Sequence, residues 1–241
     1  MAEALTARQT QILKILIDEY IETAEPVGSE SLDKKYNLGV SPATIRNEMV
    51  ALTSADFLRQ PHTSAGRIPT PKAMKFYVDQ LMEEKQMSVA EEVKAKEEVW
   101  DARGDINSLI REATHALAEK TQSLAVGAVE SGDVWHSGYA NLFLNPELAN
   151  LEFCANLLTF LEQVERMQEL FFERIMGIGP VEILFGEELG WPELTPMGVA
   201  VTRFKIGNRE GALGIIGPVR LRYPTIIPAL KYFRNLIEEI G

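Results

Sequence analysis

The spacing of apolar residues predicts short helices at the N-terminal end of the chain. Residues 5–23 place apolar side chains three and four positions apart, which is typical of an amphipathic helix. Residues 29–36 predict a shorter second helix with Ser29 as its N-cap. Ser41 followed by Pro42 is a start signal for a third helix. Two helices joined by a short turn that contains glycine are typical of a helix-turn-helix.

The segment after the third helix has the pattern of a hairpin wing. Two strand-like ends, residues 57–60 and 67–68, flank a loop rich in proline, serine, threonine and glycine. Thr70 and Pro71 repeat the cap-plus-proline signal and predict a fourth helix. Helices, a wing and a closing helix together predict a winged helix-turn-helix DNA-binding domain over residues 1–82.

The rest of the chain predicts an α+β domain behind a helical connector. Residues 83–120 are charged and weakly periodic, with Gly104 as a possible break, and we expect a connector that pairs with a second chain. Residues 141–176 predict a helix pair, and a last helix follows Tyr223. The fold class is α+β, with the second domain over residues 121–241. Strand-like segments are VEILFG, VAVTRFKI and ALGIIGPV.

The net charge of −11 at first argues against a nucleic-acid ligand, because contacts to phosphates need Lys and Arg. The distribution of the charge changes this interpretation. Residues 34–78 hold seven basic and two acidic side chains, a local balance of +5. A small basic surface on an acidic body suits a protein that binds one short duplex site.

The third predicted helix carries the candidate contacts to bases. Ile45, Met49 and Leu52 share one face, which we expect to pack in the core. On other faces, Asn47 can bond an adenine edge and Arg46 a guanine edge. An ordinary solvated helix face remains the alternative. The candidate DNA-binding residues are Ser41, Ala43, Thr44, Arg46, Asn47 and Val50 on the helix, His62, Thr63, Ser64 and Arg67 on the wing, and Lys72 after it.

The remaining residues give no support to an enzyme. The three histidines are far apart and lack Cys or carboxylate partners at ligand spacing, so we expect no metal and no cofactor. No nucleophile-elbow, dinucleotide or Walker pattern occurs. The single cysteine, Cys154, fits a small buried apolar position. The chain has no apolar run long enough to span a bilayer and no signal pattern, so we expect no membrane contact and a cytoplasmic location.

The residues also resemble a known family. The stretch EPVGSESLDKKYNLGVSPATIRNEMVALTSADFLRQPHTSAGRIPT resembles the N-terminal signature of the HrcA family of bacterial heat-inducible transcription repressors. The segments SGYANLFLNPELANLEFCANLLTFLE and ALGIIGPVRLRYPTIIPALKYF resemble its C-terminal half. The resemblance implies a homodimeric repressor of chaperone operons that binds double-stranded DNA at an inverted-repeat operator. It also implies a GroEL-type chaperonin as partner and a GAF-like second domain, with residues 41–52 as recognition helix and 62–67 as wing.

One departure from the family pattern concerns the second domain. In the family a long section separates the regions that match QSLAVGAV and VWHSGYANLF, whereas only ESGD lies between them here. The chain is therefore identified as a shortened member that lacks most of the inserted dimerisation subdomain. We expect a trimmed GAF-like sheet, and the contact that joins two copies is open.

Two other functions remain to be weighed against the dimeric repressor. The second domain could bind a small molecule, with the DNA-binding domain reporting it, although no cluster of polar groups around an apolar pocket stands out in the sequence. The chain could also be a monomeric adaptor that holds a chaperone. The first alternative predicts stabilisation by a metabolite, and the second predicts a monomer that does not bind DNA.

Overall fold

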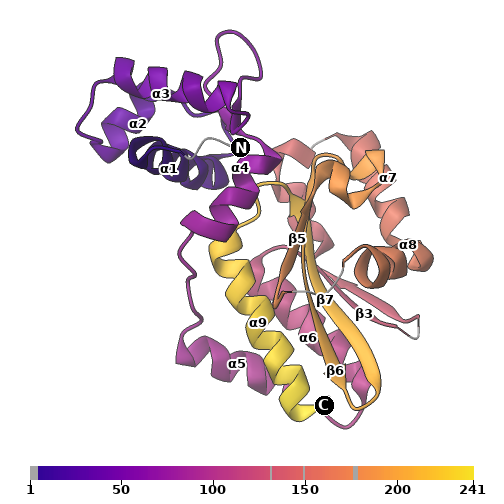
Figure 1. Cartoon of the computed structure of the whole chain (residues 1–241). Coiled ribbons are helices and arrows are strands. Elements are labelled where there is room, and N and C mark those ends of the chain that lie inside the picture. The colour runs from indigo at the N-terminus through magenta and orange to yellow at the C-terminus, as the bar shows by residue number, and fades with distance from the viewer. Residues whose placement is uncertain (1–4, 131, 149, 176–178) are drawn as a thin grey trace. The chain divides into compact units, whose positions relative to one another are not determined.

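The computed structural model describes residues 5–130, 132–148, 150–175 and 179–241. The chain forms two compact units, Met1–Glu83 and Glu84–Gly241 (Figure 1). The first unit holds three helices, a two-stranded hairpin and a closing helix, as the sequence predicts. Its elements are α1 (Ala7–Thr23), α2 (Ser29–Tyr36), α3 (Pro42–Ser54), β1 (Leu58–Arg59), β2 (Ile68–Pro69), α4 (Pro71–Phe76) and the π-helical turn η1 (Tyr77–Leu81).

Capping residues set where these helices begin. The Ser41 hydroxyl accepts a hydrogen bond from the Thr44 backbone N–H at 3.2 Å, and Pro42 occupies the first turn of α3, as predicted. The N-cap of α2 is Gly28 and not Ser29. The Gly28 backbone N–H donates a hydrogen bond to the Ser31 hydroxyl at 3.2 Å. Ser29 is the first residue of the helix and is buried.

The core of the first unit joins the apolar faces of α1, α2 and α3. The prediction that Ile45, Met49 and Leu52 pack inward is confirmed, since each is at most 4% exposed. Phe57 meets Phe76 edge to face, with ring centroids 5.5 Å apart, which ties the hairpin to α4. Other fully buried members of this core are Leu13, Leu16, Ile17, Leu32, Met74 and Tyr77.

The second unit is built on a five-stranded antiparallel sheet of order β4-β3-β7-β6-β5. The predicted α+β class is confirmed. Its strands are β3 (Leu124–Val129), β4 (Val134–Ser137), β5 (Glu182–Phe185), β6 (Met197–Ile206) and β7 (Arg209–Pro218). Its helices and turns are α5 (Val89–Trp100), α6 (Ile106–Thr121), η2 (Tyr139–Leu144), η3 (Pro146–Leu148), α7 (Leu151–Leu161), α8 (Val164–Gln168), η4 (Glu169–Arg174), η5 (Gly186–Leu189), η6 (Pro192–Leu194) and α9 (Tyr223–Ile240).

Helices cover both faces of this sheet (Figure 1). On one face, α6 packs on β3 and β4 and α9 packs on β6, with α5 against these two helices. Gly127 of β3 permits the close approach of α6, since a Cβ there would lie 2.2 Å from the Thr114 hydroxyl. The other face is covered by apolar residues of α7, α8 and η4, such as Phe160, Met167 and Phe171.

The predicted connector over residues 83–120 is not a separate segment. Both of its helices belong to the second unit, and the buried face of α6 is part of that unit's core. Pro228 lacks an N–H and cannot donate the usual helix hydrogen bond to the Pro224 carbonyl. The Lys85 backbone N–H donates to that carbonyl instead, at 2.8 Å. The segment that precedes α5 is therefore hydrogen-bonded to α9.

Two further details differ from the sequence prediction. Neither β3 nor β4 was among the predicted strands. The predicted helix pair begins with the two 3-10 turns η2 and η3 before α7, and Met176 at its end lies outside the described residues. Among the residues described, no helix is long and apolar enough to cross a bilayer.

Candidate nucleic-acid interface

One exposed face of α3 holds the candidate base contacts. Ala43, Arg46, Asn47 and Val50 are exposed on the side away from the buried residues of this helix. We call these four residues the reading face. The side chains of Arg46 and Asn47 make no hydrogen bond or ion pair with any residue that the structure describes. Their donors and acceptors are therefore available to a ligand.

The polar residues beside the reading face are already partnered. The hydroxyls of Ser41 and Thr44 lie 3.0 Å apart at the start of α3, and Thr44 is half-buried. Glu48, the acidic residue of α3, turns to α1, where it accepts from the Gln9 amide at 3.2 Å and pairs with Arg8 at 3.6 Å. The reading face therefore presents no carboxylate to a phosphate backbone.

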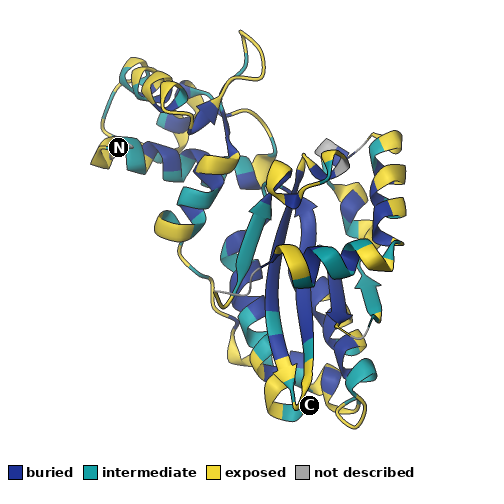
Figure 2. Cartoon of the chain, turned by 45° about the vertical axis from the view of Figure 1, so that its right-hand side comes forward, coloured by how far each residue is buried: buried dark blue, intermediate teal, exposed yellow. Residues whose placement is uncertain are grey.

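The wing is an exposed loop held from within. Its tip, residues 62–64, is exposed (Figure 2). The Gln60 side-chain amide donates to the carbonyls of Thr63 and Ala65, both at 2.9 Å. The His62 ring and the Ser64 hydroxyl lie 3.2 Å apart. These contacts give the tip a defined shape without using a partner from another element.

The base of the wing is fixed to the rest of the unit. Val27 and Arg67 exchange two backbone hydrogen bonds, at 2.9 and 2.8 Å. Arg67 also donates through Nε to the Thr53 hydroxyl of α3 at 3.2 Å. A Cβ on Gly66 would lie 2.4 Å from the Val27 carbonyl oxygen, so only glycine fits this close approach. The wing is thus placed relative to α3 before any ligand arrives.

A groove of about 580 Å³ separates α3 from the wing. Four of the candidate DNA-binding residues line it: Arg46 from α3 and Thr63, Ser64 and Arg67 from the wing. The rest of the lining comes from the start of α2, from α3 and from the wing, and consists of Gly28, Ser29, Glu30, Met49, Gln60, Ala65 and Gly66. The other candidates, Ser41, Ala43, Thr44, Asn47, Val50, His62 and Lys72, lie outside the groove.

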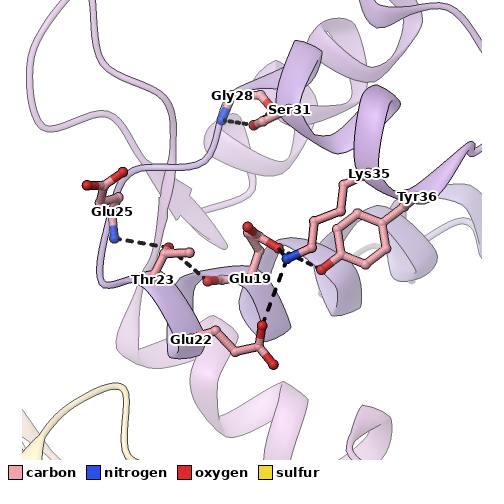
Figure 3. A network of polar contacts seen from close by, with 8 residues as sticks. All are labelled: Glu19, Glu22, Thr23, Glu25, Gly28, Ser31, Lys35 and Tyr36. Carbon is pink, nitrogen blue, oxygen red and sulfur yellow. Dashed lines mark hydrogen bonds and ion pairs between the residues drawn. The ribbon is translucent and has the colours of Figure 1, made fainter.

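A polar network holds α2 on α1 behind this surface (Figure 3). Glu19 of α1 accepts from the Lys35 ammonium at 2.6 Å and from the Tyr36 hydroxyl at 2.7 Å. Lys35, and then Tyr36, lower the pKa of Glu19 below its usual value. Asn37 follows α2 in a left-handed conformation with φ 42°, which turns the chain toward α3. The network holds α2 against α1 and also uses one of the basic residues of this region.

Basic residues differ in how free they are to meet a phosphate. Lys34, Arg46 and Arg59 are exposed and pair with no carboxylate among the described residues. Lys72 donates to the Ala55 carbonyl at 2.6 Å, and its ammonium lies 4.4 Å from the centre of the Phe57 ring. Because Ala55 follows the C-terminal end of α3, Lys72 lies at the opposite end of that helix from Ser41.

Gln60 and Gly66 contribute to this site and were not among the sequence candidates. Neither has a type-specific signal, because a glutamine and a glycine in a polar loop are ordinary turn residues. Each residue shapes the wing through a contact that only the folded structure reveals. Gln60 donates to carbonyls of the loop, and Gly66 lies against the Val27 backbone.

Comparison with protein families gives two matches that together span most of the chain. Residues 4–83 match a model described as "Winged helix-turn-helix transcription repressor, HrcA DNA-binding". Residues 71–227 match one described as "HrcA protein C terminal domain". The boundary between the two matches falls near the division between the two compact units.

Similar proteins were found by sequence and by structure. The heat-inducible transcription repressor HrcA of Acetivibrio thermocellus is 42% identical over 336 aligned positions, which cover 98% of this chain and 96% of that protein. The repressor of the same name from Carboxydothermus hydrogenoformans is 28% identical, with 97% of each chain covered. A crystal structure of a hypothetical protein has the same fold, with a TM-score of 0.76 at 20% identity and 98% of each chain covered.

The alignment lengths locate a difference from these relatives. The first alignment spans 336 positions, whereas this chain has 241 residues, so at least 95 positions of the alignment have no counterpart here. In the sequence only residues 130–133 lie between β3 and β4, where the sequence resemblance places the missing section.

Proposed function

The chain belongs to the HrcA family of heat-inducible transcription repressors, and from this premise we propose that it represses heat-shock genes by binding an inverted-repeat operator as a homodimer. The family consists of repressors and not of enzymes. In the proposed complex, α3 enters the major groove, with Arg46 and Asn47 toward the base edges. The protein acts in the cytoplasm, and a GroEL-type chaperonin is its proposed regulatory partner.

The observation that carries this proposal is the free state of Arg46 and Asn47 on an α3 face without carboxylates. Neither side chain has to give up a partner within the described residues before it binds a ligand, and Arg46 also lines a preformed groove. Val50, 49% exposed on the same face, offers methyl groups to a thymine methyl. The groove beside Arg46 has Thr63, Ser64 and Arg67 on its other wall, and these polar groups can contact a strand of the DNA backbone.

The proposed roles of the other candidates follow from their positions. Ser41 and the first N–H groups of α3 hold a phosphate at the entry to the major groove. Ala43 and Thr44 contact the same strand, and His62 at the wing tip reaches the backbone or the minor groove. Lys72 contributes only a sequence-independent attraction, because its ammonium is already bonded to Ala55.

A binding titration tests the proposal. The probes are a duplex that the protein itself selects from a random library and the same duplex with its sequence scrambled. We expect a preference of about 1000-fold or more for the selected duplex, and the affinity for each duplex should fall as salt rises. Arg46→Ala and Asn47→Ala each weaken specific binding by about 1–3 kcal/mol. Lys14→Ala on α1 removes a charge in the same unit and leaves the preference unchanged. Equal affinity for both duplexes would overturn the proposal.

A further inference from the structure

The open edge of the second unit's sheet is formed by β4, which follows residues 130–133, where the sequence resemblance places the section that is missing here. Strand β4 is half-buried and has a neighbour, β3, on one side only in the described part of the chain (Figure 2). The strand has no proline, no lysine and no bulge, the usual devices that stop an edge from pairing with another chain.

The backbone groups that face outward can be assigned from the turn. The Val129 N–H donates to the Asp133 carbonyl at 3.0 Å, whereas the Glu130 N–H donates to Glu210 of β7 at 3.1 Å. Because the bonds of an antiparallel ladder alternate, Trp135 and Ser137 face β3 with their backbone groups. The N–H and carbonyl groups of Val134 and His136 therefore point toward the open edge.

The segment that forms this edge and the turn after it carry no charged side chain. Residues 134–144 contain no Asp, Glu, Lys or Arg, in a chain in which 24% of residues are charged. Tyr139, Phe143 and Leu144 of η2, which follows β4, are 39%, 57% and 74% exposed. The rest of this unit is acidic, with 15 basic and 24 acidic side chains over residues 84–241. Two copies can therefore approach each other here with less charge repulsion than at their acidic surfaces.

We propose that β4 pairs with β4 of a second copy, antiparallel about a two-fold axis at Trp135, so that two sheets join into one. An antiparallel edge strand is self-complementary under a two-fold rotation, because its backbone donors and acceptors meet those of a second copy. In this register Val134 of one copy lies opposite His136 of the other, and each such pair exchanges two backbone hydrogen bonds. The two Trp135 side chains become a cross-strand aromatic pair.

The inference rests on the proposed dimeric repressor and names the contact that makes the dimer. Burial lowers the pKa of His136 to about 4, so its imidazole is neutral near pH 7 and adds no charge to the proposed β4–β4 contact. The two-fold axis of the paired sheets would coincide with that of an inverted repeat. The exposed stripe of Val89, Val93 and Trp100 on α5 is the competing surface.

Cysteine cross-linking of the full chain tests the register. In a Cys154→Ser background, two Trp135→Cys side chains lie opposite each other, within the reach of a disulfide. Two Asp133→Cys residues are four strand positions apart, roughly 13 Å, and cannot join. We expect mild oxidation to give a reducible dimer from Trp135→Cys, and none from Asp133→Cys or from Val93→Cys on α5.

A second variant keeps the test decisive if Trp135→Cys does not fold. Val134→Pro removes an outward N–H and leaves the β3–β4 ladder intact. We expect this variant to keep its thermal unfolding midpoint within a few degrees and to sediment as a monomer. It should bind a single half-site like the unaltered chain and the inverted repeat roughly 100-fold more weakly.

The outcomes separate this inference from the function on which it rests. A sedimenting dimer that cross-links through Val93→Cys, or no better through Trp135→Cys than through Asp133→Cys, overturns β4 pairing and leaves the dimeric repressor standing. A dimeric Val134→Pro variant also overturns β4 pairing. A chain that binds its operator as a monomer overturns both, whereas cross-linking through Trp135→Cys without sequence preference supports the interface and removes only the repressor.

Discussion

The two units of this chain expose different kinds of surface. Of the large apolar side chains that are exposed among the described residues, Val50 alone lies in Met1–Glu83, and the others lie in Glu84–Gly241. The first unit has 9 basic and 11 acidic residues, against 15 and 24 in the second. Free polar groups on a near-neutral unit suit a duplex, and apolar groups at an open edge of an acidic unit suit another protein. If the first unit binds DNA and the second unit pairs two copies, a substitution in one unit should leave the function of the other unchanged.

The largest expected effect separates the stabilities of the two units. Phe171 is fully buried in the core under the sheet, and Phe171→Ala should destabilise the second unit by about 3–5 kcal/mol. All three tryptophans, Trp100, Trp135 and Trp191, lie in this unit, so their fluorescence during denaturation reports on it alone. Binding of a single DNA half-site should remain. Simultaneous loss of half-site binding at low denaturant would mean that the units do not act separately.

A smaller effect is expected from the wing of the first unit. Gly66→Ala would place a Cβ 2.4 Å from the Val27 carbonyl oxygen, so the wing must move away from the α1–α2 loop. We expect a loss of about 2 kcal/mol in DNA binding and no change in tryptophan fluorescence. Gly104→Ala is the matched control, since a Cβ there has no described atom within 4 Å. Comparable losses in the two variants would show that the Gly66 contact does not position the wing.

The second unit should respond to mild acid through His136. Burial lowers the pKa of His136 to about 4, and its Nε2 is buried without a hydrogen-bond partner among the described residues. An unfolded histidine titrates near pH 6.5, so between these values the unfolded chain binds more protons. The free energy of unfolding should therefore fall by roughly 1–3 kcal/mol as the pH drops from 6.5 to 4. His136→Gln should remove much of this slope and His115→Gln, at an exposed site, should keep it; equal slopes would refute the assignment.

The smallest effect is expected at Lys72 of the first unit. The Lys72 ammonium already donates one hydrogen bond to the Ala55 carbonyl, so fewer of its donors are available to a phosphate. Lys72→Ala should weaken binding by about 0.5–1 kcal/mol, equally for selected and scrambled duplexes. Filter binding of both duplexes at two salt concentrations measures this. A loss confined to the selected duplex would place Lys72 at a base edge.

The first unit could be predicted from sequence because its signals are local. Ser41 with Pro42, and Thr70 with Pro71, mark helix starts within a few residues of the structure. The inward face of α3 follows from spacing alone. What escaped prediction was Gln60 and Gly66, whose partners lie in other turns, and the capping of α2 by Ser31.

The second unit was predicted less completely because its signals are not local. The apolar face of α6 was assigned to a second chain, whereas it packs on β3, where Gly127 gives room. The run LAVGAV is buried along its whole length, so it lacks the alternation that marks a half-buried strand. The edge position of β4 depends on pairings across the chain that no short pattern reveals.

The most direct measurement is the sequence profile that the full chain selects from random duplex DNA, compared with the profile of Asn47→Ala. The account predicts an inverted repeat for the unaltered chain. For Asn47→Ala it predicts the same repeat with base preference relaxed at one symmetric position in each half. A profile without two-fold symmetry, or one that Asn47→Ala leaves unchanged, would contradict the claim that α3 reads DNA in a paired protein.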